Sequence, residues 1–277
     1  MCIRDRAKWH RHSYNIPIVG IAGTHGKTIV KEWLSLLLTE KFKVVKSPKS
    51  YNSKLGLALS ILELHEEVEV GVFEVSITES GEGKLFRELL KPTIVGLTSI
   101  LKKPIGSINS KKDLLDEYAH FCSGSEHVFY PSGSDFISIQ HDNHVALDLN
   151  KFKEHLEFLN FSQEVKKANA TLCLGISDLM GVQASMRRGF FPDLAMRLES
   201  YDGIDDSFII NDTNGLDLES LETSLQYQLS VAQGKRKIVL LPKAGVMDES
   251  GTIQVLNRYQ PDAFYFIESI DDIDFSL

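Results

Sequence analysis

The feature that most constrains the fold is a glycine-rich segment near the start of the chain, residues 20–28 (GIAGTHGKT). It follows an apolar run at 16–21 that is typical of a buried strand, and it precedes a run with helical spacing. Such a turn directs backbone N–H groups, together with the positive end of the helix, toward phosphate oxygens. We therefore predict a phosphate-binding loop lined by Gly23, Thr24 and Gly26.

Two side chains at the start of the helix suit a nucleoside triphosphate. We expect the Lys27 ammonium to reach the β- and γ-phosphates and the Thr28 hydroxyl to bind Mg²⁺. The general P-loop pattern needs a glycine at position 21, where Ile21 stands, so the predicted loop is a shorter one. A tight turn without a ligand is the alternative, and the Lys-Thr pair disfavours it.

Composition limits the classes of function. With 277 residues, 43% of them hydrophobic and 25% charged, the chain resembles a soluble globular protein of one large or two ordinary domains. A net charge of −8 disfavours nucleic-acid binding. No apolar run reaches membrane-spanning length, and the three cysteines are widely spaced. We therefore expect a cytoplasmic protein with no membrane partner.

Strands and helices alternate along the first two thirds of the chain. This alternation predicts an α/β fold with a mostly parallel sheet flanked by helices. The predicted strands are 16–22, 42–45, 68–75, 93–98 and 127–130. The predicted helices are 27–39, 53–64, 82–90, 111–121, 164–179 and 182–188.

The segment 131–163 is rich in Ser, Asp, His and Asn, and we interpret its alternating runs at 136–139 and 145–149 as edge strands among loops. The strand–helix alternation begins again after about residue 193. There we predict a smaller Rossmann-like α/β unit, short for a full domain. Its predicted strands are 208–211, 237–241 and 263–267, and its predicted helices are 218–231 and 253–259. The expected organisation is a remnant at 1–15, a nucleotide-binding domain at 16–193 and a partial domain at 194–277.

A carboxylate stands at the end of the strand predicted at 68–75. Glu74 would lie at the carboxyl edge of a parallel sheet, where α/β folds bind ligands. A hard cation that bridges phosphates needs such an oxygen ligand. We therefore predict that Glu74 holds Mg²⁺ with Thr28. The alternative is that Glu74 is simply the first polar residue beyond the strand.

Several motifs, in order along residues 16–245, are similar to those of the Mur ligase family. The loop resembles that family's GT(N/H)GKT sequence, and five further stretches match it: 47–59, 71–82, 167–171, 195–199 and 209–221. The resemblance implies a central ATP-binding domain followed by part of the C-terminal domain, without the family's N-terminal domain. It also implies that Lys27 and Glu74 are catalytic.

The same resemblance assigns three more residues to nucleotide binding. Asn169 would contact the adenine, Arg197 the phosphates and Asp212 the ribose. Each has a plainer interpretation. Asn169 is then a helix cap, Arg197 a surface residue, and Asp212 an N-cap or Asx-turn before the next helix.

The activity that the resemblance implies is an ATP-dependent amide ligase of peptidoglycan synthesis. The sequences of 26–33 and 47–53 are most similar to those of family members that join D-Ala-D-Ala to a UDP-muramoyl tripeptide, including those fused to an alanine racemase. The implied cofactors are ATP and Mg²⁺. The implied mechanism is attack of an amine on an acyl phosphate, with a fused or neighbouring racemase as a further partner.

Some positions depart from the family pattern. Ser99 stands where asparagine is usual, no histidine follows it in 98–105, and Glu117 or Tyr118 lies near the place of a carbamylated lysine. These departures motivate a second hypothesis, a catalytically degenerate nucleotide-binding or scaffold remnant of such a ligase.

Overall fold

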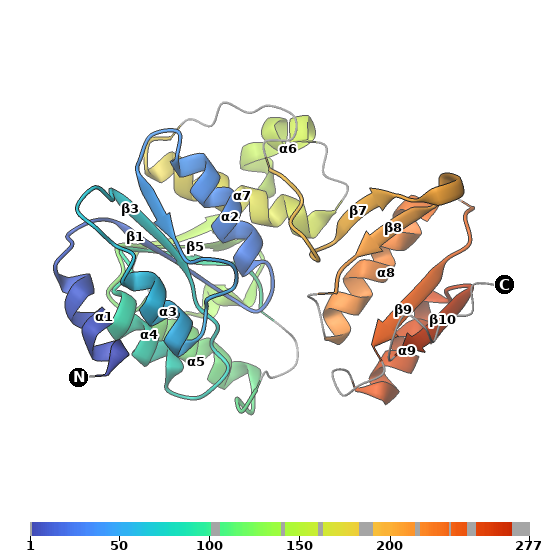
Figure 1. Ribbon diagram of the computed structural model, residues 1–277, viewed down its shortest axis with the longest axis horizontal. Coiled ribbons are helices and arrows are strands. Elements are labelled where there is room, and N and C mark those ends of the chain that lie inside the picture. The colour runs from blue at the N-terminus through green and yellow to red at the C-terminus, as the bar shows by residue number, and fades with distance from the viewer. Residues whose placement is uncertain are drawn as a thin grey trace. The chain divides into compact units, whose positions relative to one another are not determined.

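The apolar run before the glycine-rich turn is β1 (Ile18–Ala22), a strand inside a six-stranded sheet (Figure 1). This computed structural model describes residues 2–100, 106–139, 142–159, 163–182, 191–213, 217–232, 234–242 and 248–267. Contacts divide the chain into two compact units, 1–191 and 192–277, and the sequence places its boundary near Asp193.

All pairings in the sheet of the first unit are parallel, as predicted, and its strand order is β2-β3-β1-β4-β5-β6. Every residue of β1 and β3 is buried, which explains why their sequences are continuous apolar runs rather than alternating ones. The remaining bounds are β2 (Val44–Lys46), β3 (Val70–Glu74), β4 (Ile94–Leu97), β5 (His127–Pro131) and β6 (His144–Leu147).

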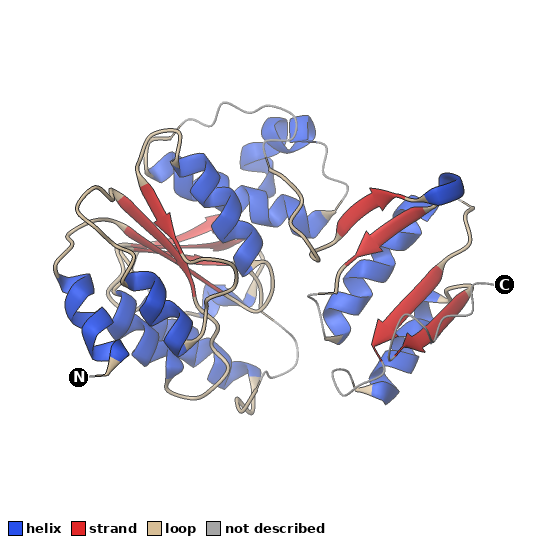
Figure 2. Cartoon of the chain, viewed as in Figure 1, coloured by secondary structure: helices blue, strands red, loops and turns tan. Residues whose placement is uncertain are grey.

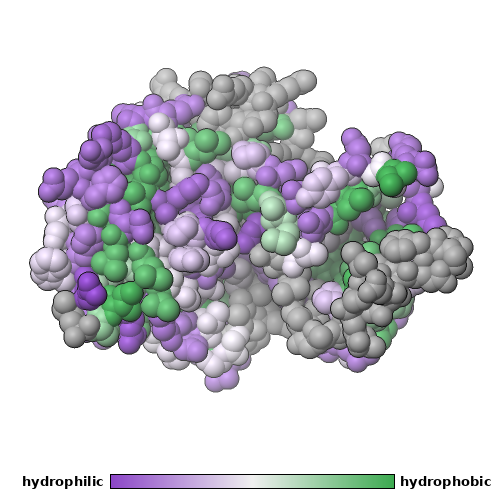
Figure 3. Space-filling model, in the orientation of Figure 1, coloured by the Kyte–Doolittle hydropathy of each residue, from purple (hydrophilic) through white to green (hydrophobic). Residues whose placement is uncertain are grey.

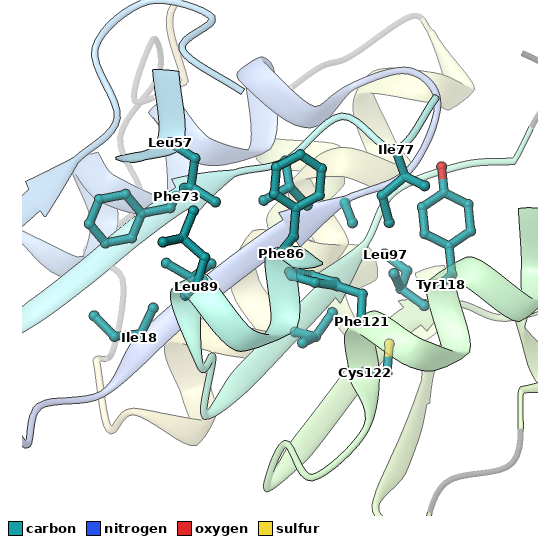
Figure 4. Close-up of a cluster of buried hydrophobic side chains, with 14 of the residues drawn as sticks. Ile18, Leu57, Phe73, Ile77, Phe86, Leu89, Leu97, Tyr118, Phe121 and Cys122 are labelled. Atoms are coloured by element: carbon teal, nitrogen blue, oxygen red, sulfur yellow. The ribbon is translucent and has the colours of Figure 1, made fainter. Parts of the chain in front are cut away.

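Helices cover both faces of this sheet (Figure 2). Consecutive side chains of β1 point to opposite faces, so Ile18 joins one buried cluster and Val19 the other. The cluster that contains Ile18 also holds Phe73, Phe86 and Phe121, shown in Figure 4. The helices are α2 (Lys27–Leu38), α3 (Lys54–Ile61), α4 (Glu82–Leu90), α5 (Lys111–Cys122) and α7 (Glu164–Leu179), all close to their predicted bounds.

The first helix, α1 (Ile3–His12), was not predicted. Half of its ten residues are charged, and only Ala7 and Arg11 are buried, so no continuous apolar face indicates a helix. Arg11 donates hydrogen bonds from its guanidinium to the carbonyl oxygens of Leu90 (2.8 Å) and Lys91 (3.2 Å). It thereby binds carbonyls at the end of α4, which links α1 to the rest of the first unit.

The segment 131–163 differs in part from its prediction. The run 145–149 contains β6, but 136–139 is not a strand, because Asp135–Ser138 forms the 3-10 helix η1. Its turn buries Phe136 against Tyr118, with 5.5 Å between the ring centroids. Two further short helices lie where the sequence predicts loops, η2 (Leu149–Phe152) and α6 (Lys153–Leu159). The helix predicted at 182–188 lies, apart from its first residue, outside the described residues.

The second unit has a small core formed by α8 (Leu218–Ala232), α9 (Glu249–Tyr259) and the parallel pair β9 (Ile238–Pro242) and β10 (Ala263–Ile267). These elements confirm the predicted strand–helix alternation. The pair β7 (Glu199–Asp202) and β8 (Phe208–Asn211) is antiparallel, joined by the short helix η3 (Ile204–Asp206). A Rossmann-like unit would instead be expected to use parallel pairs throughout.

The surface of the first unit is largely hydrophilic in the view of Figure 3, with a hydrophobic patch over α3. Leu55 and Leu59, one helical turn apart, are 55% and 39% exposed there. Within the part of the chain that the structure describes, no helix combines the length and apolar character needed to span a membrane.

The Tyr118 hydroxyl offers a test of this core. It is buried and, among the described residues, has no hydrogen-bond partner, and burial raises the pKa of the phenol. Because an unsatisfied buried polar group costs free energy, Tyr118→Phe should stabilise the first unit by about 1 kcal/mol. Urea unfolding followed by tryptophan fluorescence measures this, since both tryptophans, Trp9 and Trp33, lie in the first unit. A clear loss of stability would mean that the hydroxyl has a partner.

Candidate phosphate-binding site

The glycine-rich loop lies where the sequence predicts, between β1 and the start of α2. Gly26 is the residue before the helix and has φ of +81°, a left-handed conformation that favours glycine. A Cβ atom on Gly26 would lie 2.7 Å from Oδ1 of Asn169. Glycine is therefore required at this position both by the backbone conformation and by the close approach of α7.

The two residues that follow β4 hold the loop in place through hydrogen bonds. The backbone N–H of Thr24 donates to the Ser99 carbonyl (2.8 Å), and the N–H of His25 donates to the Ser99 hydroxyl (3.0 Å). The Thr98 hydroxyl donates to the Ala22 carbonyl (3.3 Å) and to that of His25. Ser99, which departs from the family's usual asparagine, therefore has a structural function in shaping the loop.

Lys27 and Thr28, the first residues of α2, lie beside this loop. The Lys27 ammonium donates to the carbonyls of Gly23 (3.0 Å) and Thr24 (2.7 Å), so the side chain folds back over the loop. The Thr28 hydroxyl is 3.5 Å from that of Ser50. An ammonium, a hydroxyl and the N-terminus of a twelve-residue helix thus gather at one place, which suits an anion.

Glu74 is the last residue of β3, and its side chain is fully buried. One oxygen, Oε1, accepts a hydrogen bond from Nδ2 of Asn52 (2.8 Å). The other, Oε2, accepts none from the described residues and lies 3.8 Å from Nζ of Lys31. Glu74 is thus a buried residue inside the strand rather than beyond its end, and its role toward a metal ion stays a prediction.

Lys31 and Asn52, which contact Glu74, are not among the predicted site residues. The spacing held a signal for Lys31, since it follows Thr28 by three residues and such residues share a helix face. Its complete burial depends on groups from another segment, however: Nζ donates to the Ser47 carbonyl (2.8 Å) and to that of Lys49. Asn52 lies in a stretch that we had matched to the family without assigning it a role.

Asn169 is brought to the loop by the packing of α7 on α2. The prediction of a helix cap is wrong, because α7 begins at Glu164 and Asn169 lies inside it. The side chain is 4% exposed, and within the described part of the chain its Nδ2 has no hydrogen-bond partner. A buried amide that contacts Gly26 and keeps an unsatisfied donor is a candidate ligand contact.

Arg197 and Asp212, the other two predicted nucleotide contacts, belong to the second unit. Asp212 accepts hydrogen bonds from the Leu198 backbone N–H (3.1 Å) and the Ser224 hydroxyl (2.6 Å). It is not the cap of α8, since Asp217 accepts from the first N–H groups of that helix. The roles of Arg197 and Asp212 toward a nucleotide stay predictions.

Glu117 occupies the region where the resemblance implies a carbamylated lysine. Its carboxylate accepts hydrogen bonds from the backbone N–H groups of Gly81 (2.7 Å) and Gly83 (2.8 Å), at the start of α4. A carboxylate at this position satisfies N–H groups that have no partner within the helix. Glu117 is therefore a helix-capping residue rather than a free metal ligand.

The site consists of a strand, a glycine turn, a Lys-Thr pair and a helix on a parallel sheet, with a carboxylate at the end of the neighbouring strand. This combination is typical of phosphate-binding α/β proteins. The family description of the Mur ligase middle domain matches residues 21–172, more than half of the chain. The chain belongs to the Mur ligase family.

Relatives and solved structures agree with this assignment. A UDP-N-acetylmuramoyl-tripeptide–D-alanyl-D-alanine ligase of Bacillus subtilis is 22% identical over 91% of this chain and 61% of the relative. That of Borreliella burgdorferi is 43% identical, over 30% of this chain and 18% of the relative. MurF from Acinetobacter baumannii has the same fold, with a TM-score of 0.76 at 17% identity over 94% of this chain and 64% of that one. The chain thus spans less than two thirds of the length of these proteins.

The capping role of Glu117 generates a prediction. Glu117→Ala leaves the buried N–H of Gly83 and the partly buried N–H of Gly81 without their acceptor and should destabilise the first unit by about 2 kcal/mol. Asp116→Ala, at the exposed neighbouring position of α5, is the matched control and should change stability by less than about 0.5 kcal/mol. Urea unfolding measures both. Equal effects of the two substitutions would contradict the capping role.

Proposed function

We propose that this chain carries the ATP-binding site of an ATP-dependent amide ligase that joins D-Ala-D-Ala to a UDP-muramoyl tripeptide. The observation that carries the proposal is the gathering of the glycine loop, the Lys27 ammonium, the Thr28 hydroxyl and the Glu74 carboxylate at the ends of neighbouring elements. Family membership and the names of the relatives support it, as does the Thermotoga maritima MurF structure, which was solved in complex with ADP.

The side chains present fit a magnesium ion. Mg²⁺ prefers hard oxygen ligands and usually takes one or two carboxylates together with phosphates and water. Glu74 Oε2 is a buried oxygen that accepts no hydrogen bond from the described residues, and Thr28 supplies a hydroxyl. The described ranges contain no group of three or more His, Cys, Asp or Glu residues placed to hold a metal ion, so phosphate oxygens would complete the coordination. Bound Mg²⁺ would neutralise charge on the triphosphate.

The residues of the chain then act mainly by binding and orienting. Backbone N–H groups of the loop and Lys27 would bind the terminal phosphates, and Asn169 would contact the adenine. The γ-phosphoryl group passes from ATP to the tripeptide carboxylate, which yields ADP and an acyl phosphate. The amine of D-Ala-D-Ala attacks that carbonyl carbon, inorganic phosphate leaves, and an amide forms. Positioning and charge neutralisation supply the rate enhancement.

One observation favours a second candidate function, a nucleotide-binding scaffold without turnover. Glu117 is engaged by two backbone N–H groups, and the residue beside it, Tyr118, is a buried phenol. The region in which the family resemblance implies a metal-binding lysine therefore contributes capping and core packing instead. A chain of this kind would bind ATP but release no ADP.

A cytoplasmic location is part of the proposal, because the cysteines Cys2, Cys122 and Cys173 are free thiols and ATP is the proposed substrate. Fusion to, or proximity of, an alanine racemase also remains a proposal from the sequence resemblance.

Binding of ATP is the first test. Lys27→Ala removes charge-assisted hydrogen bonds to the phosphates and should weaken ATP binding about 10- to 100-fold, measured by isothermal titration calorimetry. Lys84→Ala, which removes an exposed lysine of α4, is the matched control and should bind as the unaltered chain does. Unchanged binding by Lys27→Ala would contradict the loop assignment.

Release of ADP separates the two candidate functions. A ligase should release ADP only when the UDP-muramoyl tripeptide and D-Ala-D-Ala are both present. A scaffold should bind ATP with no ADP release under the same conditions. ADP release in the absence of either substrate would contradict the proposed reaction.

A further inference from the structure

Lys31 is a lysine with a fully buried side chain, four residues beyond Lys27 on α2. Its ammonium lies between two carboxylates, 3.0 Å from Glu32 Oε1 and 3.8 Å from Glu74 Oε2. Buried lysine ammonium groups are rare because removing the charge from water is costly, so a paired arrangement of this kind requires an explanation.

The segment 47–52 holds this ammonium at the candidate metal position. Carbonyls of Ser47 and Lys49 accept its hydrogen bonds, and the same segment contacts Glu74 through the Ser47 hydroxyl and the Asn52 amide. Ser50 places its hydroxyl 3.5 Å from that of Thr28. Segment 47–52 therefore contacts Lys31, Glu74 and Thr28.

The charges of this group are balanced without a metal ion. Glu74 is compensated by Lys31, and Glu32 also pairs with Lys46, whose side chain is 43% exposed. A divalent cation that entered alone would add two positive charges close to the Lys31 ammonium, in surroundings where water screens little. A triphosphate would remove this obstacle because it brings negative charge of its own.

We propose that Lys31 is a positioning residue that makes metal binding at Glu74 conditional on a bound nucleotide triphosphate. The ammonium orients and neutralises the carboxylate while the site is empty of nucleotide, and it disfavours a metal ion without phosphate. This inference rests on the proposed function for the identity of the anion, but the behaviour of the nucleotide-free protein tests it separately.

The experiment measures Mn²⁺ binding to the nucleotide-free chain from the paramagnetic resonance signal of free Mn²⁺, at about pH 8 so that protons compete little for carboxylates. Lys31→Met keeps the length of the side chain and removes its charge. It should create a Mn²⁺ site at least about tenfold tighter than any in the unaltered chain. Lys46→Met, which removes the other lysine that pairs with Glu32, is the matched control and should gain no such site.

Two further measurements make the outcome decisive. The gained site should disappear in the double variant Lys31→Met with Glu74→Gln, and its persistence there would overturn the proposal. After subtraction of the Mn²⁺ that an ATP analogue binds in a protein-free control, the unaltered chain should bind Mn²⁺ at least about tenfold more tightly with the analogue than without it. If the analogue binds to the chain, equal Mn²⁺ affinity with and without it would overturn the proposal even if Lys31→Met failed to fold.

The same experiments distinguish the two proposals. If the chain bound no ATP analogue at all, the proposed function would fail. A Mn²⁺ site gained by Lys31→Met and lost with Glu74→Gln would still support the role of Lys31.

Discussion

The parallel pairing of β1 with β3 and β4 is the constraint on which the site depends. Because parallel strands end at one edge of a sheet, the residue pairs Ile21–Glu74 and Ala22–Leu97 bring the glycine loop, the carboxylate and the Ser99 fastening point together. A slip of one residue in β3 would turn Glu74 to the opposite face. Because β1 and β3 are buried on both faces, their hydrophobic pattern alone does not fix this register. It depends on the packing of particular side chains, such as Ile18 with Phe73 in one cluster and Val19 with Val72 in the other.

Burial of charge is the second organising feature. A carboxylate with no exposed surface is stable only when other groups satisfy it, and Glu74 has an amide on one oxygen and an ammonium near the other. These groups reach Glu74 from helix α2 and from the segment 47–52. The geometry of the carboxylate is thus determined before any ligand arrives, which is the arrangement that binding and orienting functions need.

The sequence predicts the parts of this structure that depend on local patterns. Continuous apolar runs predicted the strands, helical spacing predicted the helices, and the glycine turn with Lys27 predicted the phosphate-binding loop. The polar helix α1 was not predicted, because only Ala7 and Ile3 join the hydrophobic cluster and its other contacts are polar, such as the hydrogen bonds from Arg11. The run at 136–139 alternates as a strand does, yet the burial of Phe136 against Tyr118 makes it a 3-10 turn. The burial of Lys31 was not predicted, because it depends on the carbonyls of Ser47 and Lys49, which no local pattern around Lys31 indicates.

The central claim is that the loop and Glu74 bind one magnesium–triphosphate unit. A crystal structure of the chain with a non-hydrolysable ATP analogue and Mg²⁺ tests it most directly. The phosphates should lie against residues 23–28, with the metal ion within about 2.0–2.1 Å of oxygens from Thr28 and Glu74. A nucleotide bound elsewhere, or a metal ion that contacts neither residue, would contradict it.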